Sequence, residues 1–198
     1  PHCRLGAFLP PIPAYTRVGD YAHGLACIVN TVFNRLEKMM HMRPGFVSKL
    51  QQLRASVMDD ARHFPRGQQV LGGLARVGAL DINGSRAFFY GGTHEDALVD
   101  LVGAHYNGEN LRQRGREMCI RAVLRMLVNA LARLHRWWKH PQWCTEGEIG
   151  LYAQAVEMFR SSWESLKWRP TLWVHWVCAH SAALLTRHRS IYMFSSLP

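Results

Sequence analysis

The stretch LRQRGREMCIRAVLRMLVNALARLHRWW, residues 111–138, carries the clearest helical pattern in the chain. At about 100° per residue, one side of this predicted helix collects large apolar side chains. They are Ile120, Val123, Leu124, Leu127, Leu131, Leu134 and Trp138. The opposite side collects cations within an arc of roughly 60°. These cations, the basic stripe from here on, are Arg114, Arg121, Arg125, Arg136 and Lys139. A long amphipathic helix of this kind predicts a mainly α-helical protein.

Apolar residues at spacings of three and four predict further helices on both sides of this stretch. The predicted ranges are 20–41, 46–61, 95–104, 148–166 and 171–188. The last range is apolar nearly all round, which predicts a buried helix. A glycine-rich segment at about 68–92 predicts turns and at most short strands. The expected fold class is therefore mainly α, an irregular multi-helix bundle.

The domain organisation follows from the prolines and from the two ends of the chain. Four prolines near the start predict an extended lead-in over 1–17, followed by a single helical domain over 18–198. The sequence starts without Met and stops inside an apolar, patterned stretch, so we expect both ends to be cuts in a longer protein. With 198 residues, 48 % of them apolar, the chain can bury a sizeable core, which argues against disorder over most of its length.

The charge balance is strongly basic. Lys and Arg number 24 against 14 Asp and Glu, which gives a formal charge of +10 and an isoelectric point near 9.9. DNA or another polyanion is the natural partner of such a surface, because each neutralised phosphate releases counterions. The basic stripe would then follow a phosphate backbone. The alternative is a solvated basic face on part of a larger protein, because every amphipathic helix needs a polar side and Arg is a good helix former.

Cysteine usage and hydropathy limit the compartment. The five cysteines are scattered and odd in number, without a C-x-x-C pair, which does not suit a secreted disulfide framework. No apolar run reaches the roughly 18–20 residues of a membrane span, and no signal peptide is visible. We therefore expect an intracellular protein of the nucleus or cytoplasm, with no membrane partner.

A candidate metal group lies near the carboxyl end, where His175, Cys178 and His180 fall within eight residues of the tryptophan-rich sequence WVHWVCAH. In an ideal helix His175 and Cys178 share a face, at i and i+3. His175 and His180 diverge by about 140°, so they share a metal only at a helix end or across a distorted turn. Structural zinc takes four ligands and this segment offers two or three, so the alternative is a pair of histidines in an aromatic core.

No complete catalytic pattern accompanies this group. A second set, His135, His140 and Cys144, matches no ligand spacing that would complete a zinc site. Asp81 lies in the sequence DING, which suits a turn without a catalytic role. No phosphate-binding loop is present. The catalytic residues are therefore unassigned.

The end of the chain resembles a known pattern. Residues 172–197 contain His175 and His180 in H-x-x-x-x-H spacing, then the polar run 186–190, and then Ile191-Tyr-Met-Phe-Ser. This order resembles the end of the helical insertion domain in RNase-H-like (DDE-type) cut-and-paste transposases, the broad group that includes the recombination-activating recombinases. In that family the two histidines join an earlier C-x-x-C in one structural zinc site, and a catalytic acid follows the Phe-Ser turn. This chain has no C-x-x-C and ends before the position of the acid.

The resemblance implies a fragment of a DNA transposase. The fragment would be a helical insertion domain that scaffolds the catalytic core, contacts DNA and is not catalytic alone. Its zinc site would be incomplete, and the parent enzyme would use Mg²⁺ on three carboxylates. Two alternatives stay open: a non-catalytic basic helical module that binds nucleic acid, and a protein-interaction domain, including a homo-oligomer, that uses its 7 tryptophans.

Overall fold

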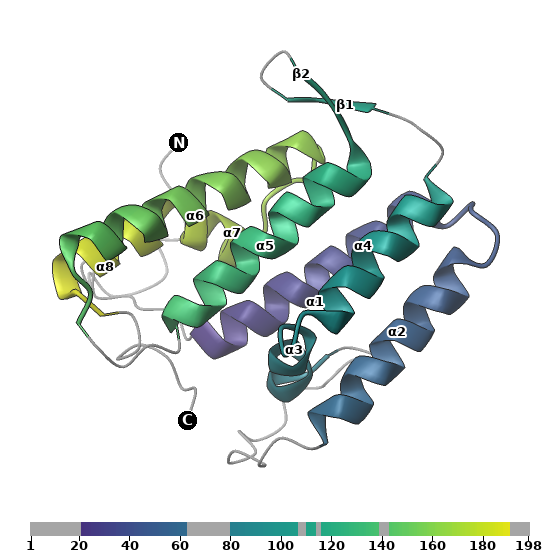
Figure 1. The fold of residues 1–198 in the computed structure, drawn as a ribbon, viewed down its shortest axis with the longest axis horizontal. Helices are drawn as coiled ribbons and strands as arrows, with labels where there is room; N and C mark the ends of the chain where they lie inside the picture. Colours follow the sequence, from purple (N-terminus) through teal and green to yellow (C-terminus); the bar gives the residue numbers. More distant parts are fainter. Residues whose placement is uncertain (1–20, 63–79, 107–109, 114–115, 139–142, 191–198) are drawn as a thin grey trace, which may run out of the picture.

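The computed structural model describes residues 21–62, 80–106, 110–113, 116–138 and 143–190. Over these residues the chain is a multi-helix bundle, which confirms the mainly α fold class (Figure 1). The predicted lead-in at 1–17 lies outside the described residues.

The first half of the bundle is built from α1 (Tyr21–Met40), α2 (Phe46–Ala61), α3 (Ile82–Phe88) and α4 (Thr93–His105). Helices α1 and α2 meet at a turn in which Gly45 adopts a left-handed conformation with φ 72°. That conformation is easily reached only by glycine, so the Pro-Gly pair ends one helix and begins the next. The predicted boundaries of both helices are confirmed to within a residue at this turn.

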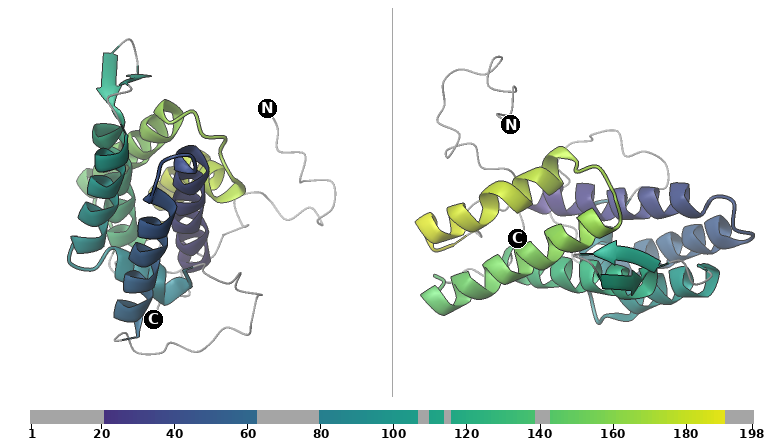
Figure 2. Two further views of the ribbon diagram at one scale, coloured as in Figure 1. Left: turned by 90° about the vertical axis from the view of Figure 1, so that its right-hand side faces the viewer. Right: turned by 90° about the horizontal axis from the view of Figure 1, so that it is seen from above.

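The second half contains α5 (Ile120–Trp138), α6 (Glu146–Ser165) and a C-terminal helix. The C-terminal helix consists of α7 (Leu172–Trp176), the π-helical turn η3 (Val177–Ser181) and α8 (Ala182–His188). Helix α6 begins with a capping box, in which Thr145 and Glu148 each bind the other's backbone N–H. Helix α5 packs between α4 and α6, and α6 runs antiparallel to it, so α5 lies at the centre of the bundle (Figures 1 and 2).

The core follows the apolar side predicted from residues 111–138. All seven apolar side chains named for that side are buried, and Trp138 is 0 % exposed. The indole nitrogen of Trp138 donates a hydrogen bond to the hydroxyl of Tyr152 on α6, at 3.1 Å. This buried hydrogen bond joins a side chain of α5 to one of α6, so it helps to fix the register of the two helices.

Two local predictions differ from the structure. Residues 110–119 are not the first turns of a helix but an antiparallel hairpin of β1 (Asn110–Gln113) and β2 (Arg116–Cys119), which extends beyond the end of the bundle (Figure 1). The described part of the glycine-rich segment at 68–92 contains a helix, α3, instead of a strand. Asp81 caps α3 by accepting a hydrogen bond from the backbone N–H of Gly84 at 2.7 Å, a structural role.

A pair of hydrogen bonds ties α3 to α1. The side-chain amide of Asn30 on α1 donates to the carbonyl of Leu80 at 2.7 Å and accepts from its N–H at 2.8 Å. Both backbone groups of Leu80 are therefore satisfied by one side chain. The entry of the chain into α3 is fixed against α1 by this contact.

The C-terminal helix leans against α1 through Trp173. A β-carbon placed on Gly24 of α1 would lie 2.7 Å from an atom of the Trp173 ring, so only glycine allows the indole to approach this closely. The prediction that this helix is buried all round is wrong. Val174, Val177 and Leu185 are buried, whereas Leu172 is 59 % exposed and His180 is exposed. The helix therefore presents one face to solvent.

Candidate functional site

The basic stripe is only partly described. Arg121, Arg125 and Arg136 lie on α5, and Arg114 and Lys139 lie outside the described residues. Arg121 forms an ion pair with Asp100, and Arg125 forms one with Asp96. Both aspartates belong to α4, which packs alongside α5. The spacing on α5 therefore predicted which cations share one side of the helix. It could not predict that acids of α4 would pair with them.

These ion pairs offset part of the positive charge of the stripe. The Arg121–Asp100 pair is largely exposed, at 59 % and 58 %, whereas Arg125 is 35 % exposed and its partner Asp96 64 %. Exposed pairs contribute little to stability.

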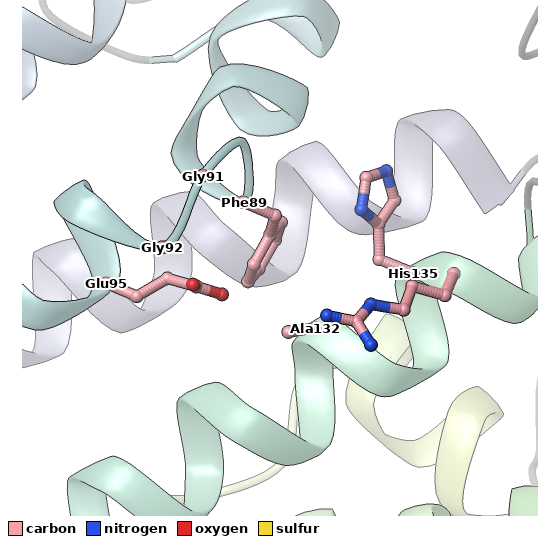
Figure 3. A pocket seen from close by; sticks show the side chains of 7 residues that line it. Phe89, Gly91, Gly92, Glu95, Ala132 and His135 are labelled. Carbon is pink, nitrogen blue, oxygen red and sulfur yellow. The ribbon is translucent and has the colours of Figure 1, made fainter.

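A pocket of about 250 Å³ opens where the α3–α4 turn meets α5. It is lined by Phe89, Gly91, Gly92, Glu95, Ala132, His135 and Arg136. In Figure 3 the carboxylate of Glu95 points toward the Phe89 ring, across from His135. Gly91 and Gly92 both have left-handed φ angles, 75° and 77°, which make the tight turn into α4 possible. The pocket thus gathers a carboxylate, an aromatic ring, an imidazole and a guanidinium.

Glu95 is the electrostatic centre of this pocket. Burial raises the pKa of its carboxyl, as does the neighbouring Asp96, whereas Arg136 and Arg125 lower it. Its Oε1 atom is buried and has no hydrogen-bond partner among the residues that the structure describes. A buried acceptor without a donor costs free energy, so this oxygen favours a ligand that brings an N–H group.

Neither Phe89 nor Glu95 was singled out from the sequence. The signal that could have found Glu95 is the pair Gly91-Gly92 followed by Thr-His-Glu, since Glu at the third position of a helix normally reaches back to its first residues. Here Oε2 of Glu95 lies close to Gly92 at the start of α4, and the same carboxylate lines the pocket (Figure 3).

The π-helical turn η3 changes the relation between His175 and His180. A π-turn contains about one residue more than an α-turn, so five residues make little more than one turn. The two imidazoles consequently lie together, with ring centres 5.4 Å apart and planes at 77°. His175 is half-buried and His180 is exposed. The distorted turn that a shared metal requires is therefore present.

The ring separation of this histidine pair is close to that of two imidazoles on one zinc ion. Two imidazoles bound tetrahedrally to one zinc, with Zn–N bonds of about 2.0–2.1 Å, have ring centres about 5 Å apart. Although His180 is exposed, partial desolvation of its ring lowers its pKa, and the neighbouring His175 lowers it further. A lowered pKa favours the neutral imidazole, which is the form that binds metal.

Cys178, predicted as a third ligand, does not join the pair. It packs against the core, facing Arg160, Glu157 and Glu164 of α6, and burial raises the pKa of its thiol to about 12. A thiol in this state is a poor metal ligand. In the ranges that the structure describes, no group of three or more His, Cys, Asp or Glu side chains could hold a metal.

Of the second set, His135 and Cys144 lie among the described residues. His135 is buried against Phe89, with ring centres 5.3 Å apart, and faces the pocket. Cys144 is buried next to Glu148, and its backbone N–H donates to the carbonyl of Arg189. His140 lies outside the described residues. His135 therefore lines the same pocket as Glu95.

The tryptophans mostly serve the core. Trp138, Trp163 and Trp168 are buried, and Trp163 and Trp168 meet edge to face with ring centres 5.2 Å apart. Trp143 is 71 % exposed, whereas Trp137, Trp173 and Trp176 are half-buried. Among the described tryptophans, only Trp143 is exposed. The protein-interaction alternative is therefore left with one exposed indole and not with an aromatic surface.

The described residues thus bring together a pair of imidazoles, a small polar pocket, and two arginines that are paired with acids of α4. None of the helices within the described ranges is long and apolar enough to cross a membrane. Comparison with known proteins finds no matching family model, no matching curated protein and no matching solved structure.

Proposed function

We propose that the chain is the helical insertion domain of an RNase-H-like DNA transposase, a scaffold that contacts DNA and is not catalytic alone. The observation that carries the proposal is the meeting of His175 and His180 across the π-turn. An H-x-x-x-x-H sequence in a regular helix separates its imidazoles, so a π-turn at this position suits a shared metal.

Zinc, when bound, would lock the C-terminal helix to the segment that supplies the remaining ligands. His175 and His180 would hold it from this chain. Because α7 is anchored on Gly24 of α1, the metal would connect a second segment to the bundle as a whole. Residues that follow the helix would then hold a fixed position relative to the scaffold.

A metal experiment tests this half-site directly. Co²⁺ is added to the chain together with a short peptide that contains C-x-x-C, and visible absorption is recorded. We expect the intense bands of tetrahedral Co²⁺ with thiolate ligands only when chain and peptide are both present. His175→Ala and His180→Ala should remove the contribution of the chain, and His188→Ala is the matched control. Bands that are unchanged in His175→Ala would contradict the proposal.

DNA contact is tested by fluorescence anisotropy on a labelled duplex over a range of salt concentrations. The variant R114E/R121E/R125E inverts three stripe cations, and K38E/K49E/R169E inverts three exposed cations elsewhere. Each variant replaces three cations by three anions and lowers the formal net charge from +10 to +4. The two variants therefore have the same net charge. We expect the stripe variant to lose at least about ten-fold in affinity and to have the shallower salt slope. Equal losses would assign DNA binding to net charge alone.

The second candidate is a non-catalytic nucleic-acid-binding module, which the formal charge of +10 favours. The two experiments separate the candidates. DNA binding without any cobalt signal favours the simple module, and both signals together favour the insertion domain.

A further inference from the structure

We propose that the pocket between the α3–α4 turn and α5 binds an unpaired guanine base. It reads the base through Glu95 and Arg136 against the ring of Phe89. The inference rests on the proposed function only for the source of the base, which is DNA. The site itself is argued from the pocket's own side chains.

The size of the pocket sets the first limit on its ligand. Drug-sized ligands occupy cavities of about 300–1,000 Å³. A volume of about 250 Å³ admits a single fused ring system and leaves the sugar and phosphate outside. The two left-handed glycines form one rim, and a β-carbon on Gly91 would meet no atom within 4 Å, so that rim is open to solvent.

The polar groups set the second limit. The buried Oε1 of Glu95 needs a donor, and Oε2 of the same carboxylate lies at the glycine rim, 3.5 Å from where a β-carbon of Gly92 would be. A carboxylate with two available oxygens matches two adjacent N–H donors. Guanine has such donors in N1–H and its 2-amino group, whereas adenine and cytosine each carry a single amino group.

Arg136 would bind the other edge of guanine, which carries O6 and N7. It lines the pocket and is near enough to Glu95 to lower the pKa of that carboxyl, yet no ion pair joins the two within the described part of the chain. A ligand between them therefore meets a donor as well as an acceptor. Guanine presents O6 and N7 as acceptors, the atoms that arginine binds in pairs. Phe89 and His135, whose ring centres lie 5.3 Å apart, form an aromatic wall of the pocket against which a base can pack.

The base must be unpaired. In duplex DNA the N1–H and 2-amino donors of guanine are occupied by cytosine, so only a single-stranded or extruded guanine offers them to Glu95. Arg121 and Arg125 lie on the same side of α5 as Arg136, so the adjoining phosphates would run along the stripe. A pocket for a base and cations for its backbone thus share one helix.

Anisotropy of the whole chain with labelled oligothymidylate tests the proposal. The oligonucleotide carries one central guanine, hypoxanthine or adenine. We expect guanine to bind about ten-fold more tightly than adenine, and hypoxanthine, which lacks the 2-amino donor, to fall between them. The preference should persist at higher salt, because hydrogen bonds to a base release no counterions.

The variant Glu95→Gln should change affinity for the adenine and guanine oligonucleotides in different ways. It removes a negative charge, so it should strengthen binding of the adenine oligonucleotide while abolishing the guanine preference. Arg136→Gln should weaken binding of both oligonucleotides and also reduce the preference. Glu164→Gln, on the exposed face of α6, is the matched control and should keep the preference. A guanine preference that survives in Glu95→Gln overturns the proposal.

Competition with guanosine monophosphate shows whether the pocket accepts free nucleotides as well as DNA. This nucleotide also tests the pocket if the chain binds no oligonucleotide. Displacement of the guanine oligonucleotide by guanosine but not adenosine monophosphate assigns the pocket to free nucleotides as well as DNA. Displacement only by guanine-containing DNA restricts it to DNA. If the chain binds no oligonucleotide, the proposed DNA contact fails, and calorimetry with guanosine monophosphate still reports on the pocket. Oligonucleotide binding without any base preference overturns the guanine pocket alone.

Discussion

Helix α5 and the C-terminal helix were both interpreted by counting 100° per residue, and the outcomes differ. On α5 the count was right for all seven apolar residues, which are buried. On the C-terminal helix it predicted that His175 and His180 diverge, yet their rings lie 5.4 Å apart. The difference is the turn η3, which adds one residue to an otherwise regular helix. Periodicity is thus reliable only where the helix is uninterrupted.

The two helices also differ in how their polar faces are satisfied. Arg121 and Arg125 on α5 find acids on a neighbouring helix. His175 and His180 face each other, and the electrostatic effect of His175 lowers the pKa of His180. Arg121 and Arg125 are thus paired across two helices, whereas the two histidines contact each other within one helix. Four changes test this contrast.

The largest effect is expected on the buried side of α5. Trp138→Ala removes a fully buried indole and its hydrogen bond to the Tyr152 hydroxyl. Such truncations cost about 3–5 kcal/mol. Urea unfolding followed by circular dichroism measures the loss. Trp143→Ala, at a 71 % exposed position, is the control and should stay within about 0.5 kcal/mol.

The next effect concerns the π-turn. Deleting Ala179, an exposed residue, removes the extra residue and converts the spacing of the histidines to i and i+4 on a regular helix. We expect the deletion variant to keep its Ni²⁺ affinity within a few-fold and to melt at the same or a higher temperature. His175→Ala should lose about ten-fold or more in calorimetric titration. If the deletion abolishes Ni²⁺ binding, the π-turn does more than align the two rings.

A smaller effect is expected where α4 meets α5. Asp96→Asn with Asp100→Asn frees Arg121 and Arg125 and should tighten DNA binding by about ten-fold at low salt. Stability should change by less than about 1 kcal/mol per exposed pair. Asp59→Asn with Glu164→Gln alters the same charge at exposed positions on α2 and α6 and should change DNA affinity less. Equal gains would show that the ion pairs do not restrain the stripe.

The smallest effect is the pH dependence of His180. Its pKa is lowered in the folded chain from the ordinary value of 6.5, so the unfolded chain binds the proton more readily. The resulting stability is complete above pH 6.5 and is lost as pH falls through the lowered value. His180→Gln should therefore flatten the melting temperature below pH 6.5 relative to the parent chain. An identical slope in both proteins would contradict the assigned shift.

Most helix positions were predictable because apolar spacing, Pro-Gly and capping residues act locally. The hairpin at 110–119 was missed because its strands are short and polar and directly precede Ile120. The strong helical pattern that begins there was extended over them. The π-turn was missed because no Gly or Pro marks residues 177–181. Asp96 and Glu95 were missed as site residues because their partners belong to another helix, and such a contact depends on tertiary packing.

The two hydrogen bonds between Asn30 and Leu80 bear on where the chain could accept an insertion. Helix α3 packs against α2 as well as α1, so contacts among the described residues hold it in place. Closing a longer connection costs only slowly increasing entropy. We therefore expect a domain inserted between Arg62 and Leu80, or new termini opened there by circular permutation, to be tolerated, and we expect Asn30→Ala to lower that tolerance.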